Sequence, residues 1–216
     1  MATASPPLHR LVVLASGNGS NLQAIIDTSV VEEFPAAVVA VVSDRADSGA
    51  LVRANEAGIN AVHIGRADGE ERCDYDRRLA DEVERWHPDL VVLAGWMRLL
   101  TTSFLARFPD RIINLHPALP GELPGTHAIE RAWQQAMAGD RTRSGVMIHY
   151  VPDEGVDDGP VIACEEITIR PDDTLERFET RVHRVEHRLL VDTIRDLCLS
   201  TDLPSPISSR TPQELP

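Results

Sequence analysis

The fold is set by residues 11–26, which read LVVLASGNGSNLQAII. Residues 11–15 form a short, continuous apolar run, which is typical of a strand buried on both faces of a parallel sheet. A glycine-containing turn follows at residues 16–20, and the apolar spacing after it predicts a helix from Asn21. A strand, a turn and a helix in this order are the first unit expected of an α/β domain.

The same alternation continues as far as residue 115. The expected strands span 37–42, 61–64, 90–94 and 111–115, and the expected helices span 48–57, 74–86 and 103–108. Regular alternation of this kind predicts an α/β fold with a doubly wound, mostly parallel sheet.

The pattern changes after His116. Residues 117–125 contain three prolines and two glycines, so we expect a loop there. A helix (128–137), two strands expected to pair antiparallel (145–151 and 160–170) and a long closing helix (173–199) complete the prediction. We expect one domain over 11–199, with halves 11–115 and 116–199, a flexible N-terminus at 1–10 and a disordered tail at 200–216.

Composition excludes several functions. The chain has 216 residues, of which 43% are hydrophobic, and its formal net charge is −13. This length supports a substantial core, and the negative charge argues against binding nucleic acid. Because the sequence contains no lysine, a lysine Schiff base and a P-loop nucleotide site are both excluded.

The three cysteines, Cys73, Cys164 and Cys198, are widely separated and lack the spacing of metal ligands. We therefore expect no metal site, and such sparse cysteine use suits the reducing cytoplasm. Residues 1–10 contain no apolar signal-peptide core, and no apolar run has membrane-spanning length. We expect a cytoplasmic monomer or homodimer that binds neither membrane nor nucleic acid.

Two polar side chains follow the apolar run 111–113, namely Asn114 and His116. In open α/β sheets, ligands bind at the carboxyl ends of the strands. An amide there can donate a hydrogen bond to a developing oxyanion, and an imidazole can move a proton near neutral pH. Taken alone, the pair is also explained by a strand-end cap and a structural loop histidine.

Two further segments carry possible chemistry. The turn at residues 16–21 can bind an anion through backbone N–H groups at the start of a helix. It is not the dinucleotide fingerprint, because Leu22 stands where that motif needs a third glycine. Phosphate binding and a plain turn both remain open. The acidic loop 153–160 does not fit a calcium-binding loop, and by itself it indicates a solvent-exposed turn.

Together these segments have the order and approximate spacing of the folate-dependent formyltransferases. The chain resembles this family, and within it the branch that formylates glycinamide ribonucleotide in purine biosynthesis. The resemblance is carried by residues 16–27, 91–100, 113–117, 149–151 and 157–162. It implies a Rossmann-like half that holds the phosphoribosyl substrate, and a second half that completes a folate cleft.

The implied reaction moves the formyl group of 10-formyltetrahydrofolate, a cosubstrate, to the primary amine of glycinamide ribonucleotide. Neither a bound cofactor nor a metal is implied. By match to the family motifs, the implied site residues are Asn114, His116 and Asp157 for catalysis; Gly19, Ser20 and Asn21 for the phosphate; Glu186 for the ribose; and Arg72, Met97, Arg98, Leu99, Leu100 and Asn114 for folate.

The sequence departs from the family pattern in three places: the loop 118–124, His183, and one extra residue in the acidic loop. The extra residue makes both Asp157 and Asp158 candidates for the catalytic carboxylate, and the alignment of residues 157–160 favours Asp157. In the expected mechanism Asn114 stabilises the oxyanion and His116 transfers a proton. Asp157 is expected to raise the pKa of His116 by its opposite charge.

Alternative functions remain at this point. A formyltetrahydrofolate deformylase would use catalytic residues like Asn114, His116 and Asp157 to transfer the formyl group to water. It usually carries an additional N-terminal domain, for which a first strand at Leu11 leaves no room. A methionyl-tRNA formyltransferase is disfavoured by the net charge of −13. A non-catalytic nucleotide-binding module would need the glycine turn but not the trio.

Overall fold

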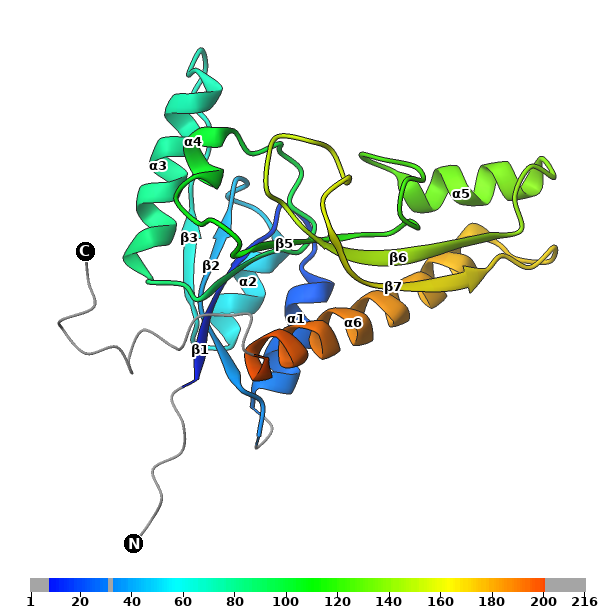
Figure 1. The fold of residues 1–216 in the computed structure, drawn as a ribbon, viewed down its shortest axis with the longest axis horizontal. Coiled ribbons are helices and arrows are strands. Elements are labelled where there is room, and N and C mark those ends of the chain that lie inside the picture. The colour runs from blue at the N-terminus through cyan, green and yellow to red at the C-terminus, as the bar shows by residue number, and fades with distance from the viewer. Residues whose placement is uncertain (1–7, 31–32, 201–216) are drawn as a thin grey trace, which may run out of the picture.

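The computed structural model describes residues 8–30 and 33–200. Of the expected flexible N-terminus (1–10) and disordered tail (200–216), residues 1–7 and 201–216 lie outside the described residues, whereas His9 and Arg10 belong to β1 and Ser200 caps α6. Seven strands form one sheet in the order β3-β2-β1-β4-β5-β6-β7 (Figure 1). They are β1 (His9–Leu14), β2 (Ala36–Ser43), β3 (Asn60–His63), β4 (Leu90–Leu93), β5 (Ile112–His116), β6 (Arg143–Tyr150) and β7 (Val161–Thr168).

The pairing confirms the predicted fold class. Strands β1 to β5 pair in parallel, whereas β6 is antiparallel to both β5 and β7. The helices are α1 (Ser20–Ser29), α2 (Gly49–Glu56), α3 (Arg72–Arg85), α4 (Thr102–Leu105), α5 (Ala128–Met137) and α6 (Leu175–Leu199). The elements agree with the predicted order, although β1 begins two residues earlier, at His9, and α4 ends earlier, at Leu105.

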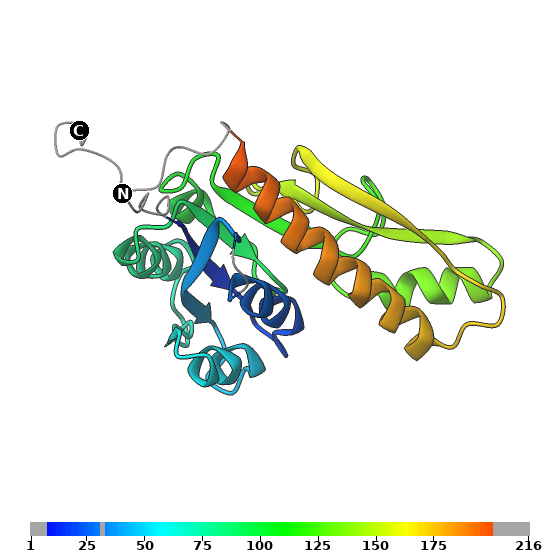
Figure 2. The same cartoon turned by 90° about the horizontal axis from the view of Figure 1, so that it is seen from below.

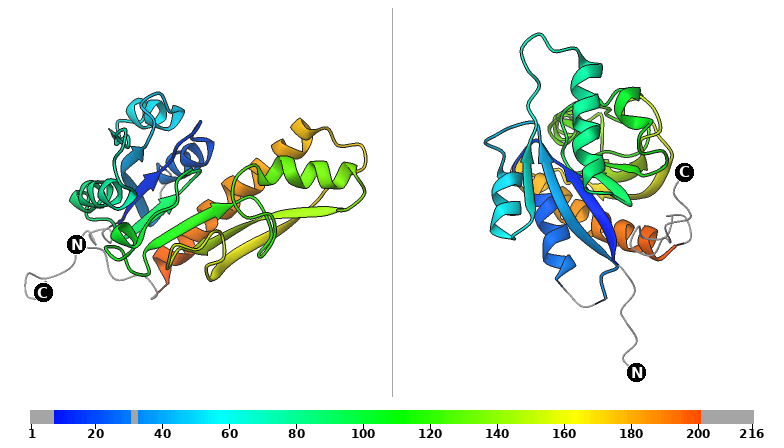
Figure 3. Two further views of the ribbon diagram at one scale, coloured as in Figure 1. Left: turned by 90° about the horizontal axis from the view of Figure 1, so that it is seen from above. Right: turned by 90° about the vertical axis from the view of Figure 1, so that its left-hand side faces the viewer.

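Helices cover both faces of the sheet, and a separate apolar cluster lies under each face. One cluster joins the sheet to α1, α2, α5 and α6, and the other joins it to α3 and α4. Figures 2 and 3 show α3 on the opposite side of the sheet from α1. The fully buried β4, in the middle of this sandwich, accounts for the uninterrupted apolar run in its sequence.

The topology brings the ends of several segments to one edge. Because β1, β4 and β5 are parallel neighbours, their carboxyl ends and the loops that follow lie side by side. The long helix α6 runs beside α1 and crosses beneath β6 and β7 (Figure 2). None of the described helices is both long and apolar enough to cross a membrane.

Candidate active site

Strand β5 carries Asn114 and His116 to this edge. Because the two residues are two positions apart, their side chains project from the same face of the strand. His116 is 4% exposed and Asn114 is half-buried. The neighbouring β6 runs antiparallel, and its register places His149 directly opposite Asn114. The strand pairing therefore adds a second imidazole to the two side chains that the sequence brought forward.

The loop between β6 and β7 returns Asp157 to this group. One carboxylate oxygen, Oδ2, lies 3.2 Å from His116 Nδ1 and accepts a hydrogen bond of 2.7 Å from the backbone N–H of Gly125. The other, Oδ1, accepts one of 3.0 Å from the amide of Asn114. We call Asn114, His116, His149 and Asp157 the candidate catalytic cluster. The structure thus brings Asp157, rather than Asp158, to His116.

The side-chain amide of Asn114 has two acceptors. Its Nδ2 atom donates to Asp157 Oδ1 and lies 3.1 Å from His149 Nε2. The other ring nitrogen of His149, Nδ1, lies 2.8 Å from the carbonyl oxygen of Tyr150, which can only accept. Nδ1 of His149 therefore carries a proton, and Nε2 faces the Asn114 amide as an acceptor. His149 thereby fixes the orientation of the Asn114 amide.

His116 has acceptors at both ring nitrogens. Nδ1 faces Asp157, and Nε2 lies 3.0 Å from the carbonyl oxygen of Leu123. Burial nevertheless lowers the pKa of His116, because it outweighs the opposing effects of the Asp157 charge and the Leu123 carbonyl. Asp157 thus raises the pKa of His116, as expected, but burial has the larger effect and the net shift is downward. A lowered pKa leaves His116 neutral, and able to accept a proton, at neutral pH.

Burial also acts on the pKa of Asp157, but here other effects outweigh it. Desolvation alone would raise the pKa of this carboxyl, whereas the nearby His149, whose Nε2 atom lies 3.6 Å from Oδ1, the Gly125 N–H and the neighbouring His116 together lower it. Asp157 therefore remains ionised. Its backbone φ of 54° lies in the left-handed region, which is uncommon for residues other than glycine. The surrounding contacts hold this conformation in place.

The glycine turn after β1 opens α1. Gly19 has a φ of 80°, and a Cβ there would lie 2.8 Å from Ala50 Cα, so α2 packs directly against the turn. No side chain caps the N-terminus of α1, so first-turn N–H groups, including those of Ser20 and Asn21, are free of such a cap. Arg53 stiffens the turn by donating to the carbonyl of Asn18 at 2.9 Å. The arrangement suits an anion.

Glu186 on α6 reaches the same end of α1. Its side chain is 5% exposed, and its Oε2 atom lies 2.7 Å from His183 Nδ1 and 3.5 Å from Asn21 Nδ2. This contact raises the pKa of His183. The residue that departs from the family pattern therefore partners the carboxylate that the resemblance assigns to the ribose.

The segment after β4 contains the residues implied for folate. Met97 and Leu99 are exposed, whereas Leu100 is 4% exposed and packs in the core. Arg98 donates to Asp44 Oδ2 at 2.7 Å and lies over the Tyr75 ring, so its guanidinium is already paired.

Arg72, at the start of α3, donates to the carbonyl of Leu99 at 3.3 Å. The structure thus brings Arg72 and residues 97–100 together, near the loop that carries Asp157.

Sequence reasoning assigned no catalytic role to His149, and it missed Gly125 and Arg53. From the sequence, His149 was one of two histidines that could approach the cleft, and a structural role explained it at least as well. The matching stretch 149–151 was the available signal, but only strand register shows its contact with Asn114. Gly125 acts through its backbone, which no side-chain pattern reveals. In the parts of the chain that the structure describes, no group of acidic, histidine and cysteine residues could hold a metal ion.

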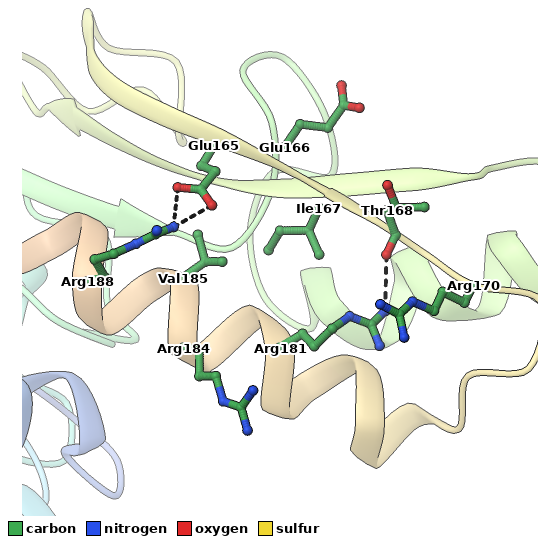
Figure 4. A pocket seen from close by; sticks show the side chains of 9 residues that line it. All are labelled: Glu165, Glu166, Ile167, Thr168, Arg170, Arg181, Arg184, Val185 and Arg188. Atoms are coloured by element: carbon green, nitrogen blue, oxygen red, sulfur yellow. Dashed lines mark hydrogen bonds and ion pairs between the residues drawn. The ribbon is translucent and has the colours of Figure 1, made fainter.

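A hollow of about 650 Å³ lies elsewhere, between β7 and α6 (Figure 4). We call it the arginine groove; it is lined by Glu165, Glu166, Ile167, Thr168, Arg170, Arg181, Arg184, Val185 and Arg188. Arg188 pairs with Glu165, and Arg181 donates to the Thr168 carbonyl at 3.1 Å. No member of the candidate catalytic cluster lines it. The chemistry therefore points to the strand ends rather than to this hollow.

Comparison with known proteins identifies the family. Residues 9–194 match the formyl transferase family. The phosphoribosylglycinamide formyltransferase of Schizosaccharomyces pombe is 43% identical over 87% of this chain and 96% of its own length. The Escherichia coli protein of the same name is 38% identical over 83% of this chain and 82% of its own length.

Solved structures give the same result. A glycinamide ribonucleotide transformylase from Symbiobacterium toebii superposes with a TM-score of 0.81 at 38% identity and covers 88% of each chain. A phosphoribosylglycinamide formyltransferase from Bacillus halodurans gives a TM-score of 0.82 at 35% identity, over 88% of this chain and 96% of its own. With a family match over most of its length and relatives well above 30% identity, the chain belongs to the formyl transferase family.

Proposed function

We propose that this formyl transferase moves the formyl group of 10-formyltetrahydrofolate to the primary amine of glycinamide ribonucleotide, a step of purine biosynthesis. The observation that carries the proposal is the candidate catalytic cluster. It combines an amide donor, a buried neutral imidazole and an ionised carboxylate within hydrogen-bond distance of one another. The names of the similar proteins indicate the substrate that is formylated.

The reaction needs one proton acceptor and one oxyanion donor. The amine nitrogen attacks the formyl carbon, and the carbonyl electrons move to oxygen. Neutral His116 keeps its own proton on Nδ1, toward Asp157. Its Nε2 atom exchanges the contact with the Leu123 carbonyl for one with the amine and takes the proton that the attacking nitrogen loses, a role that its lowered pKa suits. The bond from the formyl carbon to the folate nitrogen then breaks, and His116 returns the proton to that nitrogen. Asp157 stabilises the imidazolium between the two transfers.

Asn114 donates to the oxyanion by exchanging one existing hydrogen bond. Its amide is shared between the carboxylate of Asp157 and the Nε2 atom of His149. Hydrogen bonds to charged acceptors are the stronger ones, so the hydrogen that faces His149 is the one released to the oxyanion. One such donor typically contributes about 2.7–4 kcal/mol to transition-state stabilisation.

The remaining residues bind the two substrates. The Gly19–Asn21 turn, after the first strand, binds the phosphate through the uncapped N-terminus of α1, and Glu186 accepts from the ribose hydroxyls. Arg72 and residues 97–100 line the folate side of the cleft. The half formed by residues 11–115 thus holds the ribonucleotide phosphate and supplies these folate contacts, and residues 116–199 complete the cleft and contribute Glu186. The free cysteines support a cytoplasmic location.

The test uses the purified protein and 10-formyltetrahydrofolate, with and without glycinamide ribonucleotide. We expect tetrahydrofolate to form only when the ribonucleotide is present, together with one equivalent of formylated ribonucleotide. Formation of tetrahydrofolate and formate without ribonucleotide would instead identify a deformylase. If the protein binds the ribonucleotide but leaves the formyl group on folate, it is a non-catalytic binding module.

A further inference from the structure

Glu154 makes a contact that the reaction scheme does not use. It lies three residues before Asp157, in the loop between β6 and β7. Its Oε1 atom accepts two hydrogen bonds from Thr102 at the start of α4, one of 2.8 Å from the backbone N–H and one of 2.9 Å from the hydroxyl. The loop that carries Asp157 is therefore tied to the opposite wall of the cleft.

The Thr102 contact also holds Glu154 in its charged form. Both hydrogen bonds lower the pKa of Glu154, and the positive charge of Arg72 acts in the same direction. Arg72 in turn donates to the carbonyl of Leu99. Glu154, Thr102, Arg72 and Leu99 thus connect the acidic loop to the segment 97–102.

The loop itself is compact, so a change at one of its residues affects the neighbouring ones. A Cβ on Gly155 would lie 2.2 Å from the Asp158 carboxylate, and one on Gly159 would lie 1.9 Å from the Tyr150 carbonyl. The backbone N–H of Gly155 is bonded to Asp153 Oδ1 at 2.9 Å. In so compact a turn, fixing Glu154 restricts where Asp157, with its left-handed backbone, can point.

We propose that Glu154 is a positioning residue, which through Thr102 fixes both the carboxylate that faces His116 and the wall that faces folate. The role in folate binding rests on the proposed function, whereas the effect on His116 does not. Loss of the contact lets Asp157 move away from His116. Since the charge of Asp157 raises the pKa of His116 against the effect of burial, that pKa then falls further.

The experiment compares Glu154→Ala, Thr102→Val and their combination with the unaltered full chain. Two quantities are measured: the pKa of His116, by NMR titration of its imidazole, and the KM for 10-formyltetrahydrofolate. We expect Glu154→Ala to lower the pKa of His116 and to raise the KM for 10-formyltetrahydrofolate several-fold. Thr102→Val, which keeps the backbone N–H, should have a smaller effect in the same direction. The double variant should not exceed Glu154→Ala, because both residues act through one contact.

Glu166→Gln is the matched control, since it removes one exposed carboxylate that pairs with Arg143 outside the cleft. It should leave both quantities unchanged. Glu154→Gln keeps an oxygen acceptor and should restore most of the His116 pKa. An unaltered His116 titration or an unaltered folate KM in Glu154→Ala overturns the proposal. If the unaltered protein transfers no formyl group, the proposed function fails, while the titration still tests the effect of Glu154 on His116.

Discussion

The candidate catalytic cluster and the arginine groove both contain acidic and basic side chains, but they differ in burial. In the cluster, His116 is 4% exposed, and burial lowers its pKa although a carboxylate lies 3.2 Å away. In the groove, Arg188 and Glu165 form an ion pair whose side chains are 58% and 38% exposed. Water screens the ion pair of Arg188 and Glu165 but is excluded from the contact between His116 and Asp157.

The difference shows why a hollow is not by itself a guide to the site. The groove encloses about 650 Å³, yet most of its charges are arginines, which stay protonated under all working conditions. The cluster offers groups that can change protonation state near neutral pH. A reaction that moves one proton from an amine to a leaving nitrogen requires such groups. Four predictions test whether this distinction holds, beginning with the largest effect.

Removing either central side chain of the cluster should nearly abolish transfer. In Asn114→Ala the oxyanion loses its donor, and we expect turnover to fall by roughly 10²–10³. In His116→Ala the proton has no acceptor, and we expect a fall of roughly 10²–10⁴. Steady-state kcat with both substrates saturating is the measurement. Near-normal turnover in either variant would remove that residue from the mechanism.

Asp157→Asn should shift the pH dependence of kcat/KM. His116 must be neutral to accept a proton, so activity is lost as the pH falls through the pKa of His116. The Asp157 charge raises that pKa, while burial lowers it. Without the charge the pKa falls further, so the acidic limb should move to lower pH while the rate itself decreases. An acidic limb that keeps its position, or moves to higher pH, contradicts the assigned pairing of Asp157 with His116. Asp158→Asn serves as the control.

Gly19→Ala tests the phosphate side of the cleft. The added Cβ would lie 2.8 Å from Ala50 Cα, at a φ of 80°. Backbone strain costs about 1–2 kcal/mol, and the steric contact adds to it. Gly58→Ala is the matched control, because its φ is 69° but its Cβ would meet nothing within 4 Å. We expect a larger loss of unfolding free energy in Gly19→Ala, and a raised KM for the ribonucleotide in that variant alone.

Arg188→Gln in the groove should have the smallest effect. Exposed ion pairs contribute about 0–1 kcal/mol, so unfolding free energy should change by no more than that. The variant should keep the kcat and both KM values of the unaltered protein. A marked loss of activity would show that the groove takes part in the reaction and would remove the contrast between the two regions.

Much of the fold followed from local patterns. Apolar and alternating stretches predicted all seven strands; the continuous apolar run of β4 reflects burial on both faces, whereas β7 is partly exposed. Boundaries were less certain: α4 is four residues long, and β1 includes His9 and Arg10, where burial by neighbouring elements overrides the polar sequence. The formyl transferase family was likewise indicated by the sequence and is confirmed.

The site was predicted in part. Asn114 and His116 stood out because polar side chains at the end of a buried apolar strand are unusual and indicate a structural or functional role. His149 lacked such a signal, since its contact with Asn114 depends on antiparallel register between distant segments. The direction of the His116 pKa shift also escaped prediction. It results from competition between a charge and burial, and the sequence shows only the charge.

The sequence by itself determined the kinds of groups available: a chain without lysine, an anion-type turn after the first strand, and an amide and an imidazole at the end of β5. These depend on residue type and local periodicity, which a linear sequence records. The tertiary structure alone decided that Asp157 faces His116, that His149 orients Asn114, and that Glu154 holds Thr102. Distances and exclusion of water arise only when distant segments pack together, and they set both pKa values and hydrogen bonds.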